Sequence, residues 1–461
     1  MSANDIIGIV VDNLTMALMA IISISIIFFL TYFFIYKKLL KGTKTLSIKT
    51  LIKVFLLTGY MLMVLGVTFF NRHEFYNGGV DVSLFSSYRE AWNSFTVSSW
   101  QFIYLNIVMF VPFGILLPFI HERFQKATWT IGLAVLFTLS IESIQRITGL
   151  GNFVVDDLFN NIVGAIIGYA LSMCIISLKH KKWKRAIIHL APLFVLLIIS
   201  GSFYLYYEVK AFGNLEVKPA RTVQMNEATV KSDVSLDENR QSLPVYQTKK
   251  LTKHEADQFA ETFFETIQAD PAHIEDISYP DLAIYRMYDE ESYSLSVDFR
   301  NGAYDFMDFS QLDDGMEVGK ATEKMLREHL QSFAITIPEE AIFQQLDTGY
   351  YSWTADLLRV DDQIIDGEIE VAYFHDKTIK NINHQMITYE KTTDVQVKSE
   401  QEAYEELMQG RFSYGKQEVH EIEIYDVTIQ YALDSKSYYQ PIYAFRSLVD
   451  GEEYTILIPA I

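Results

Sequence analysis

The sequence has almost no cysteine. Cys174 is the single cysteine of the chain and lies inside a hydrophobic run, so no disulfide can form within the chain. A domain outside the membrane must then depend on its hydrophobic core, which about 250 residues can supply. The beginning of the chain also lacks the basic region of a secretory signal peptide, because Asp5 and Asp12 precede the first apolar run. We therefore expect that run to remain as an uncleaved helix.

The signatures of common catalytic and metal sites are also missing. The sequence contains no Gly-x-Ser-x-Gly motif and no glycine-rich phosphate loop. Its histidines after residue 250 do not have the His-x-x-x-His spacing of metal ligands. The pairs Asp313–Asp314 and Asp361–Asp362 are typical of turns. We predict neither a catalytic residue nor a metal or other cofactor from these patterns.

Basic charge is scarce in the second half of the chain. Residues 1–207 contain 16 Lys and Arg and 9 Asp and Glu, a net charge of +7, whereas residues 208–461 contain 22 and 49, a net charge of −27. A strongly anionic region repels nucleic acid, so we exclude DNA or RNA as a partner. Such asymmetry indicates that the two halves occupy different environments.

Long hydrophobic runs fill the first half. A helix needs about 20 apolar residues to cross a bilayer. Six segments have approximately that length, at 14–36, 51–70, 100–120, 128–147, 158–178 and 187–207. They predict a polytopic α-helical membrane bundle of six transmembrane helices over residues 1–207.

The connections between these segments alternate in charge. Lys and Arg follow the first, third and fifth segments, at Lys37, Lys38, Lys41, Lys44, Arg123, Lys126, Lys179, Lys181, Lys182, Lys184 and Arg185. The other connections carry mixed or acidic charge. Because cytoplasmic loops carry an excess of Lys and Arg, these three loops are predicted to be cytoplasmic. The N-terminus and everything after Tyr207 are then extracytoplasmic.

Polar side chains gather near the predicted outer ends of the spans. Ionisable residues inside spans are costly and usually mark function. Those expected at a similar depth are Arg72, His73, Asn106, Glu142, Gln145, Arg146, Asp156, Asp157, Asn160 and Asn161. Together they predict a polar cleft that opens to the outer leaflet and binds a ligand.

Simpler roles stay open for two members of this group. Asp156 or Asp157 would also serve as the N-cap of the fifth helix, accepting hydrogen bonds from its backbone N–H groups. Glu142 lies only about 8 Å below the end of its span, so it could reach lipid headgroups or pair with Arg146 one turn away.

Small residues and prolines predict how the helices pack. Gly164 and Gly168 form a small-xxx-small pair, which favours close packing of the fifth helix against a neighbour. Pro112 interrupts the third span, where we expect a kink.

Three motifs within these spans resemble the VanZ-like family. They are Asn106-Ile-Val-Met-Phe-Val-Pro-Phe-Gly114, Glu142-x-x-Gln145, and Phe153-Val-Val-Asp-Asp-Leu-Phe-Asn-Asn-Ile-Val-Gly-Ala-Ile-Ile-Gly-Tyr169. The resemblance covers about residues 50–180. Many members have an Asp where this chain has Val154, and an Arg shortly before the Asp pair where it has Gly151 and Asn152. The family is named for a protein linked to teicoplanin resistance in Gram-positive bacteria, so the resemblance implies a role at the cell envelope and in glycopeptide tolerance.

The second half is expected to be an extracytoplasmic acidic α+β domain over residues 251–461, after a linker or irregular segment at 208–250. Three helices are predicted near 252–268, 318–334 and 399–409, the first and last with capping boxes that begin at Thr252 and Ser399. The predicted strands are 283–288, 293–299, 303–309, 353–360, 368–374, 379–389, 418–433, 438–447 and 453–458. The recurring helix–strand order predicts repeated modules.

The last 65 residues are similar to PepSY-like and YycI/YycH-type outer modules of Gram-positive bacteria. The resemblance rests on the segments Tyr438–Phe445 and Val449–Ala460, and it implies a binding or regulatory domain. Three functions follow from the sequence as a whole. The first is binding of membrane lipid, a cell-wall precursor or another lipid-linked ligand at the outer cleft. The second is regulation of a membrane sensor kinase as protein partner, and the third is an enzyme acting on a lipid-linked phosphate or sugar.

Overall fold

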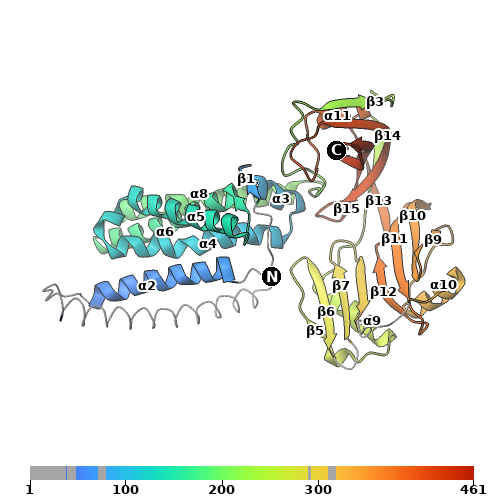
Figure 1. Cartoon of the computed structure of the whole chain (residues 1–461), viewed down its shortest axis with the longest axis horizontal. Helices are drawn as coiled ribbons and strands as arrows, with labels where there is room; N and C mark the ends of the chain where they lie inside the picture. The colour runs from blue at the N-terminus through green and yellow to red at the C-terminus, as the bar shows by residue number, and fades with distance from the viewer. Residues whose placement is uncertain (1–37, 39–47, 71–78, 289–291, 310–317) are drawn as a thin grey trace. The chain divides into compact units, whose positions relative to one another are not determined.

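The computed structural model describes residues 38, 48–70, 79–288, 292–309 and 318–461 (Figure 1). The chain divides into two compact units. Of the described residues, one unit contains those up to Tyr88 together with Ser99–Lys210, and the other contains those in Arg89–Ser98 and Ala211–Ile461. We call them the membrane unit and the outer unit and describe each by itself.

Five helices in the described residues are long and apolar enough to cross a membrane. They are α2 (Ile48–Leu65), α4 (Val97–Ile120), α5 (Ala127–Thr148), α6 (Val155–Lys179) and α8 (Ala191–Val209). They confirm as helices the spans predicted from 51–70 onward. The span predicted at 14–36 lies outside the described residues, so the structure supports a multi-pass membrane unit without fixing six as the number of spans.

Short elements at one end of these helices were not predicted. The π-helix η2 (Gly66–Phe70) continues α2, and α3 (Ser86–Ser94) precedes α4. The two-residue strands β1 (Val80–Asp81) and β2 (Phe153–Val154) pair in parallel. The backbone N–H of Gly79 also donates to Asn152 Oδ1 over 2.9 Å. The strand pair and this hydrogen bond hold the chain before α3 against the start of α6.

Glycines bring α4 and α6 into backbone contact. A Cβ atom added at Gly164 would lie 2.0 Å from the Ile107 carbonyl oxygen, and one at Gly168 would lie 2.0 Å from that of Val111. Gly114 of α4 is equally close to α6, with 2.1 Å to the Ala165 oxygen. No side chain fits at these three positions, which explains the small residues there.

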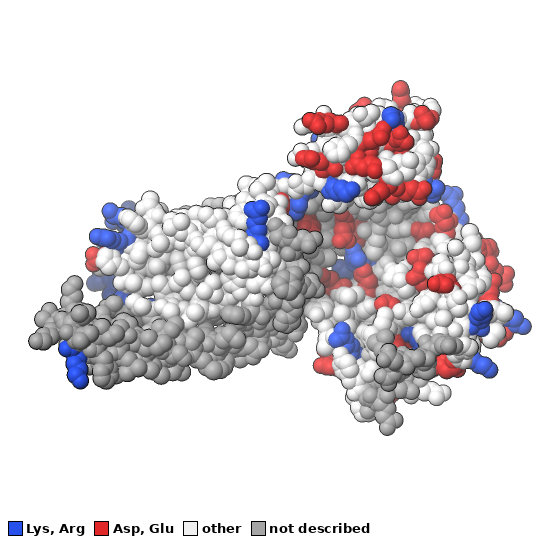
Figure 2. Space-filling model, viewed as in Figure 1, with Lys and Arg blue, Asp and Glu red and all other residues white. Residues whose placement is uncertain are grey.

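Charge is concentrated at the opposite end of the helices. The connection η3 (Glu122–Gln125) and the helix α7 (Trp183–His189) lie there, with the basic residues that flank them. Lys53 of α2 donates to the Phe119 carbonyl oxygen at the end of α4 over 2.6 Å. Figure 2 shows Lys and Arg at this end, and a largely uncharged surface along the helices.

The outer unit is built on one twisted sheet, with 14 strands in the described residues. The strands are β3 (Thr229–Ser232), β4 (Ser242–Gln247), β5 (Glu275–Asp276), β6 (Leu282–Tyr288), β7 (Ser292–Asp298), β8 (Tyr304–Asp308), β9 (Ile342–Asp347), β10 (Tyr350–Val360), β11 (Gln363–Tyr373), β12 (Ile379–His384), β13 (Ile387–Gln396), β14 (Glu421–Leu433), β15 (Tyr438–Val449) and β16 (Glu452–Pro459). Their main order is β3-β14-β15-β4-β13-β11-β12-β8-β7-β6-β5, with β10 between β9 and β11, and β16 beside β15. Only β3 and β14 are parallel among these pairs.

Three helices and a short 3₁₀ turn, η4 (Pro271–His273), complete this unit. The helix α9 (Lys253–Thr266) begins with the predicted capping box of Thr252 and Glu255. The helix α11 (Glu400–Met408) begins with that of Ser399 and Glu402. The helix α10 (Glu323–Ser332) is shorter than predicted, because Thr322 caps it and Val318 forms a β-bridge with Phe374 instead.

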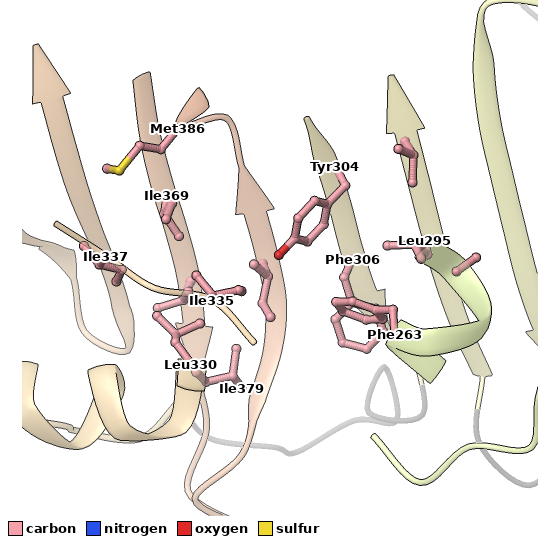
Figure 3. Close-up of a cluster of buried hydrophobic side chains, with 14 of the residues drawn as sticks. Phe263, Leu295, Tyr304, Phe306, Leu330, Ile335, Ile337, Ile369, Ile379 and Met386 are labelled. Atoms are coloured by element: carbon pink, nitrogen blue, oxygen red, sulfur yellow. The ribbon is translucent and has the colours of Figure 1, made fainter. Parts of the chain in front are cut away.

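Two main hydrophobic cores support the sheet, and a third, small cluster of buried residues lies around Ile364 and Tyr389. The larger core lies where α9 and α10 pack on strands β6 to β12. Figure 3 shows two of its contacts: Phe263 of α9 lies beside Phe306, and Leu330 of α10 lies near Ile379. The smaller core lies under α11, around Phe412. The helices α9 and α10 therefore share one core, whereas α11 lies on the other.

Two local predictions for the outer unit differ from the structure. The segment 208–250 contains β3 and β4, and β4 pairs with both β13 and β15, so this part belongs to the sheet. The single strand predicted at 379–389 is two strands that both pair with β11, and β12 also pairs with β8 whereas β13 also pairs with β4. Ile382 and Met386 are buried at even positions, whereas Ile387 and Tyr389 are buried at odd positions, and a continuous strand does not allow this change of phase.

A candidate ligand site at one end of the membrane helices

Asp156 connects the start of α6 to the start of α3. Its Oδ1 atom accepts a hydrogen bond from the Phe85 N–H over 2.6 Å, and its Oδ2 atom accepts one from the Ser87 N–H over 2.8 Å. The residue is fully buried. The predicted N-cap role for its own helix is not seen, because α6 begins after Val154. Asp156 instead caps α3, where a carboxylate is favoured by free N–H groups.

A second buried carboxylate supports the same turn. Asp81 accepts hydrogen bonds from the Ser83 N–H over 2.9 Å and from the Ser86 hydroxyl over 2.8 Å. The Ser86 hydroxyl also lies 3.4 Å from Asp156 Oδ2. Ser86 thus stands between two carboxylates.

Asp157 and Asn106 join α6 to α4. The Asn106 side-chain amide donates to Asp157 Oδ1 over 2.5 Å. Both side chains are partly buried. The two residues were assigned to one depth from sequence, and the structure brings them into direct contact.

Glu142 and Gln145 lie on the buried face of α5. Glu142 is 4% exposed, and its Oε2 atom lies 3.4 Å from the Val154 N–H at the start of α6. The Gln145 amide donates to the Thr68 carbonyl oxygen in η2 over 3.3 Å. A π-helix changes the direction of backbone carbonyls and often occurs at functional sites.

Asn160 and Asn161 each have an amide atom without a partner in the described residues. Asn160 Oδ1 accepts from the Tyr88 hydroxyl, and Asn161 Nδ2 donates to Thr138 Oγ1 over 2.8 Å. Asn160 Nδ2 and Asn161 Oδ1 have no hydrogen-bond partner, although both residues are 1% exposed. A buried polar group left in this state costs about 1–3 kcal/mol, so each needs an explanation.

Aromatic rings cover Asn160. Phe85, Tyr88 and Phe159 pack edge to face, with ring centroids 5.4 to 6.3 Å apart. Burial and the nearby Asp156 carboxylate raise the pKa of Tyr88, so its hydroxyl stays protonated and donates to Asn160. Phe85 has a left-handed backbone (φ 67°), a strained conformation for a bulky residue that is held by the Asp156 contact.

Arg146 stands apart from this group. Its side chain is exposed, and no ion pair joins it to Glu142 in the part of the chain that the structure describes. Arg72 and His73, which were also assigned to this depth, lie outside the described residues. The members of the site that the structure describes therefore form a cluster of amide, hydroxyl and carboxylate groups, and the cleft stays a prediction.

A cavity in the membrane unit lies elsewhere on the same helices. Its volume is about 320 Å³. It is lined by Leu57, Met61, Phe113, Leu117, Leu133, Leu136, Phe137 and Ser140. This lining is almost entirely apolar and includes none of the polar residues predicted from sequence.

Several members of the cluster were missed in the sequence. Thr68, Thr138 and Ser86 are ordinary small polar residues, and nothing in their spacing marks them. Thr138 is four residues before Glu142, which was the available signal for the same helix face. The role of Tyr88 depends on α3, a helix that the hydrophobic pattern did not reveal.

Comparisons with known proteins agree with the motifs of the membrane unit. The VanZ/LLP1 family model matches residues 16–177. None of the curated proteins matches the chain.

Two solved structures show a weak likeness to this chain. An uncharacterized protein from Eubacterium rectale ATCC 33656 is 8% identical, with a TM-score of 0.26, over 50% of this chain and 86% of that one. The Bacillus megaterium YpeB C-terminal domain is 9% identical, with a TM-score of 0.22, over 46% of this chain and 94% of that one.

The family match, the motifs and the apolar helices describe the same part of the molecule. The match begins within the first predicted span and ends near the end of α6. It leaves the mostly β-sheet outer unit outside. Residues 16–177 therefore match the VanZ/LLP1 family, and the apolar helices fit a multi-pass membrane protein with an additional C-terminal domain.

Proposed function

We propose that the protein binds an amphipathic or lipid-linked ligand of the Gram-positive cell envelope through the buried polar cluster, and that this binding contributes to tolerance of the glycopeptide teicoplanin. One observation carries the proposal. Polar side chains that are 0–4% exposed, Asp156, Asn160, Asn161, Glu142 and Gln145, gather at one end of otherwise apolar helices. Such groups are costly inside a membrane and are usually kept for function.

The proposed orientation places this cluster toward the outer leaflet. The opposite end of the helices carries the basic residues, including Arg123, Lys126 and Lys181, which the positive-inside rule assigns to the cytoplasm. The outer unit is then extracytoplasmic. A Cys174→Ala background allows a test with Lys181→Cys and Glu452→Cys, two exposed positions. On intact cells a membrane-impermeant maleimide should label only the cysteine at position 452; labelling of only that at 181 would reverse the orientation.

The ligand proposal is tested by single substitutions in the cluster. Glu142→Ala, Asp156→Ala and Asn161→Ala should each increase teicoplanin susceptibility at equal protein levels in the membrane. Thr148→Ala is the matched control, because this exposed hydroxyl donates only within its own helix, to the Ile144 and Gln145 carbonyl oxygens. Unchanged susceptibility in all three cluster variants would remove the site.

A second candidate function is regulation of a membrane sensor kinase by the outer unit. It rests on the resemblance of the last 65 residues to YycI/YycH-type modules. If this function holds, a kinase should co-purify with the full chain and be lost when residues 250–461 are removed. Retention of the kinase by the truncated chain would reject it.

A further inference from the structure

We propose that the group bound at the polar cluster is an uncharged sugar, carried by a glycolipid of the surrounding leaflet. The inference rests on the proposed function of the same site. It goes further by naming the ligand chemistry.

The two asparagines define what the ligand must offer. Asn160 Nδ2 is a donor and Asn161 Oδ1 is an acceptor, and neither has a partner in the described residues. The two side chains follow one another on α6, so they point about 100° apart. A ligand that satisfies both must carry several groups that donate and accept, as the hydroxyls of a sugar do.

The neighbouring charges disfavour a phosphate. The buried carboxylate of Asp156 lies on α6 with the asparagines, and that of Glu142 lies on α5, which contacts Asn161 through Thr138. A third buried carboxylate, Asp81, accepts a hydrogen bond from Ser86 at the start of α3. A phosphate carries negative charge and offers only acceptors, so it would be repelled here and would leave Asn161 Oδ1 unsatisfied. An ammonium group would suit the carboxylates but offers no acceptor to Asn160 Nδ2.

The aromatic rings beside Asn160 are a second, independent indication. Phe85 is 42% exposed and Phe159 is 36% exposed. Their ring centroids lie 5.4 Å apart, next to Tyr88. Exposed ring faces beside amide and carboxylate groups suit the two sides of a sugar, whose C–H face is apolar and whose edge is polar. Tyr88 is only half-buried and its hydroxyl donates to Asn160 Oδ1, so it is the side chain that a ligand would displace to reach the Asn160 amide.

The test is a binding measurement on the full chain in nanodiscs of phosphatidylglycerol. Native mass spectrometry would compare four probes: diglucosyldiacylglycerol, diacylglycerol with the same chains, phosphatidic acid, and a polyprenyl-diphosphate-linked sugar. We expect the glycolipid to bind at least about fivefold more tightly than diacylglycerol, which corresponds to one or more net hydrogen bonds. Asn160→Leu and Asn161→Leu should each reduce this preference by about five- to tenfold, whereas Thr148→Ala should preserve it.

Each contrary outcome overturns a stated part of the inference. Equal binding of glycolipid and diacylglycerol would exclude the sugar, and tighter binding of phosphatidic acid would exclude an uncharged group. If the diphosphate-linked sugar binds more tightly than the glycolipid, the glycolipid is rejected as the lipid that carries the sugar. Phe159→Leu gives a second variant in case the asparagine variants fold poorly, and it should weaken binding of the glycolipid but not of diacylglycerol. If Glu142, Asp156 and Asn161 variants still alter susceptibility while no sugar preference is found, the site stands and the sugar assignment fails.

Discussion

The two units of this chain place polar and apolar side chains in opposite ways. In the outer unit the largest buried side chains are aromatic, such as Trp353, and charge lies on the surface, as Figure 2 shows. In the membrane unit large apolar side chains such as Phe102 and Ile198 are 66% exposed, and Asp156 is fully buried. A buried polar residue is therefore a weak indication of function in the outer unit, where water and hydrogen-bonding groups are near. In the membrane unit the same residue indicates function.

The largest effect is expected from removing an aromatic anchor of the outer unit. Trp353 of β10 is fully buried, and its indole N–H donates to Glu323 of α10 over 3.2 Å. Trp353→Ala should lower the free energy of unfolding of this unit by about 4 kcal/mol, measured by thermal or denaturant unfolding of the full chain. Val360→Ala on the same strand, where the side chain is 44% exposed, should cost far less. Equal costs would contradict the assigned core.

Helix packing in the membrane unit gives the next largest effect. Gly164→Ala places a methyl group 2.0 Å from the Ile107 oxygen, so α4 and α6 must separate. We expect a loss of about 3 kcal/mol, visible as a lower unfolding temperature in detergent. Gly132→Ala on α5 is the control, because no atom lies within 4 Å of the added group. A Gly164 variant as stable as the control would show that the helices do not meet there.

A helix cap in the outer unit should have a smaller effect. Thr252→Ala removes the side chain that accepts from the Glu255 N–H over 3.3 Å. The expected loss is about 1 kcal/mol, measured by the same unfolding experiment. Thr262→Ala in the same helix should be neutral or stabilising, since that hydroxyl only donates back to the Gln258 carbonyl oxygen. Reversal of the two results would refute the capping box.

The smallest expected effect is a dependence of outer-unit stability on acid. Hydrogen bonds from Lys249 and Thr252 lower the pKa of Glu255 to about 2, and those from Arg240 and Ser399 lower the pKa of Glu402 to about 2. Because the folded-state pKa values are below the unfolded ones, the contribution is full above about pH 4.5 and is lost as the pH falls toward 2. Glu255→Gln and Glu402→Gln should flatten the stability profile in that window. Both carboxylates are exposed, so added salt should weaken the effect, and a salt-independent slope would point to other groups.

The sequence predicted most of what depends on long patterns. Hydrophobic runs located α2, α4, α5, α6 and α8, and the capping boxes located the starts of α9 and α11 within a residue. Strand pairing was harder, because β4 lies in a polar stretch whose partners β13 and β15 are far along the chain. No local pattern encodes such a partner.

The sequence predicted which residues belong to the candidate site, but it did not predict the contacts that they make. Polar residues within apolar helices identified Asn106, Glu142, Asp156 and Asn161 without any structure. The contact of Asp156 with Phe85 and Ser87 depends on α3, whose composition is ordinary for a loop. Pairing of Glu142 with Arg146 was allowed by spacing, but Arg146 faces outward while Glu142 is buried.

The central claim is that the membrane unit keeps its buried polar residues for function rather than for stability, and Asn161→Leu tests it most directly. Leucine has a similar volume. It removes an oxygen that has no hydrogen-bond partner in the described residues, but also the amide group that donates to Thr138 Oγ1 over 2.8 Å, so the two changes have opposite effects on stability. Unfolding temperature in detergent and teicoplanin susceptibility at equal protein levels would be measured on the same variant. We predict a nearly unchanged unfolding temperature together with increased susceptibility. A large loss of stability with unchanged susceptibility would contradict the account.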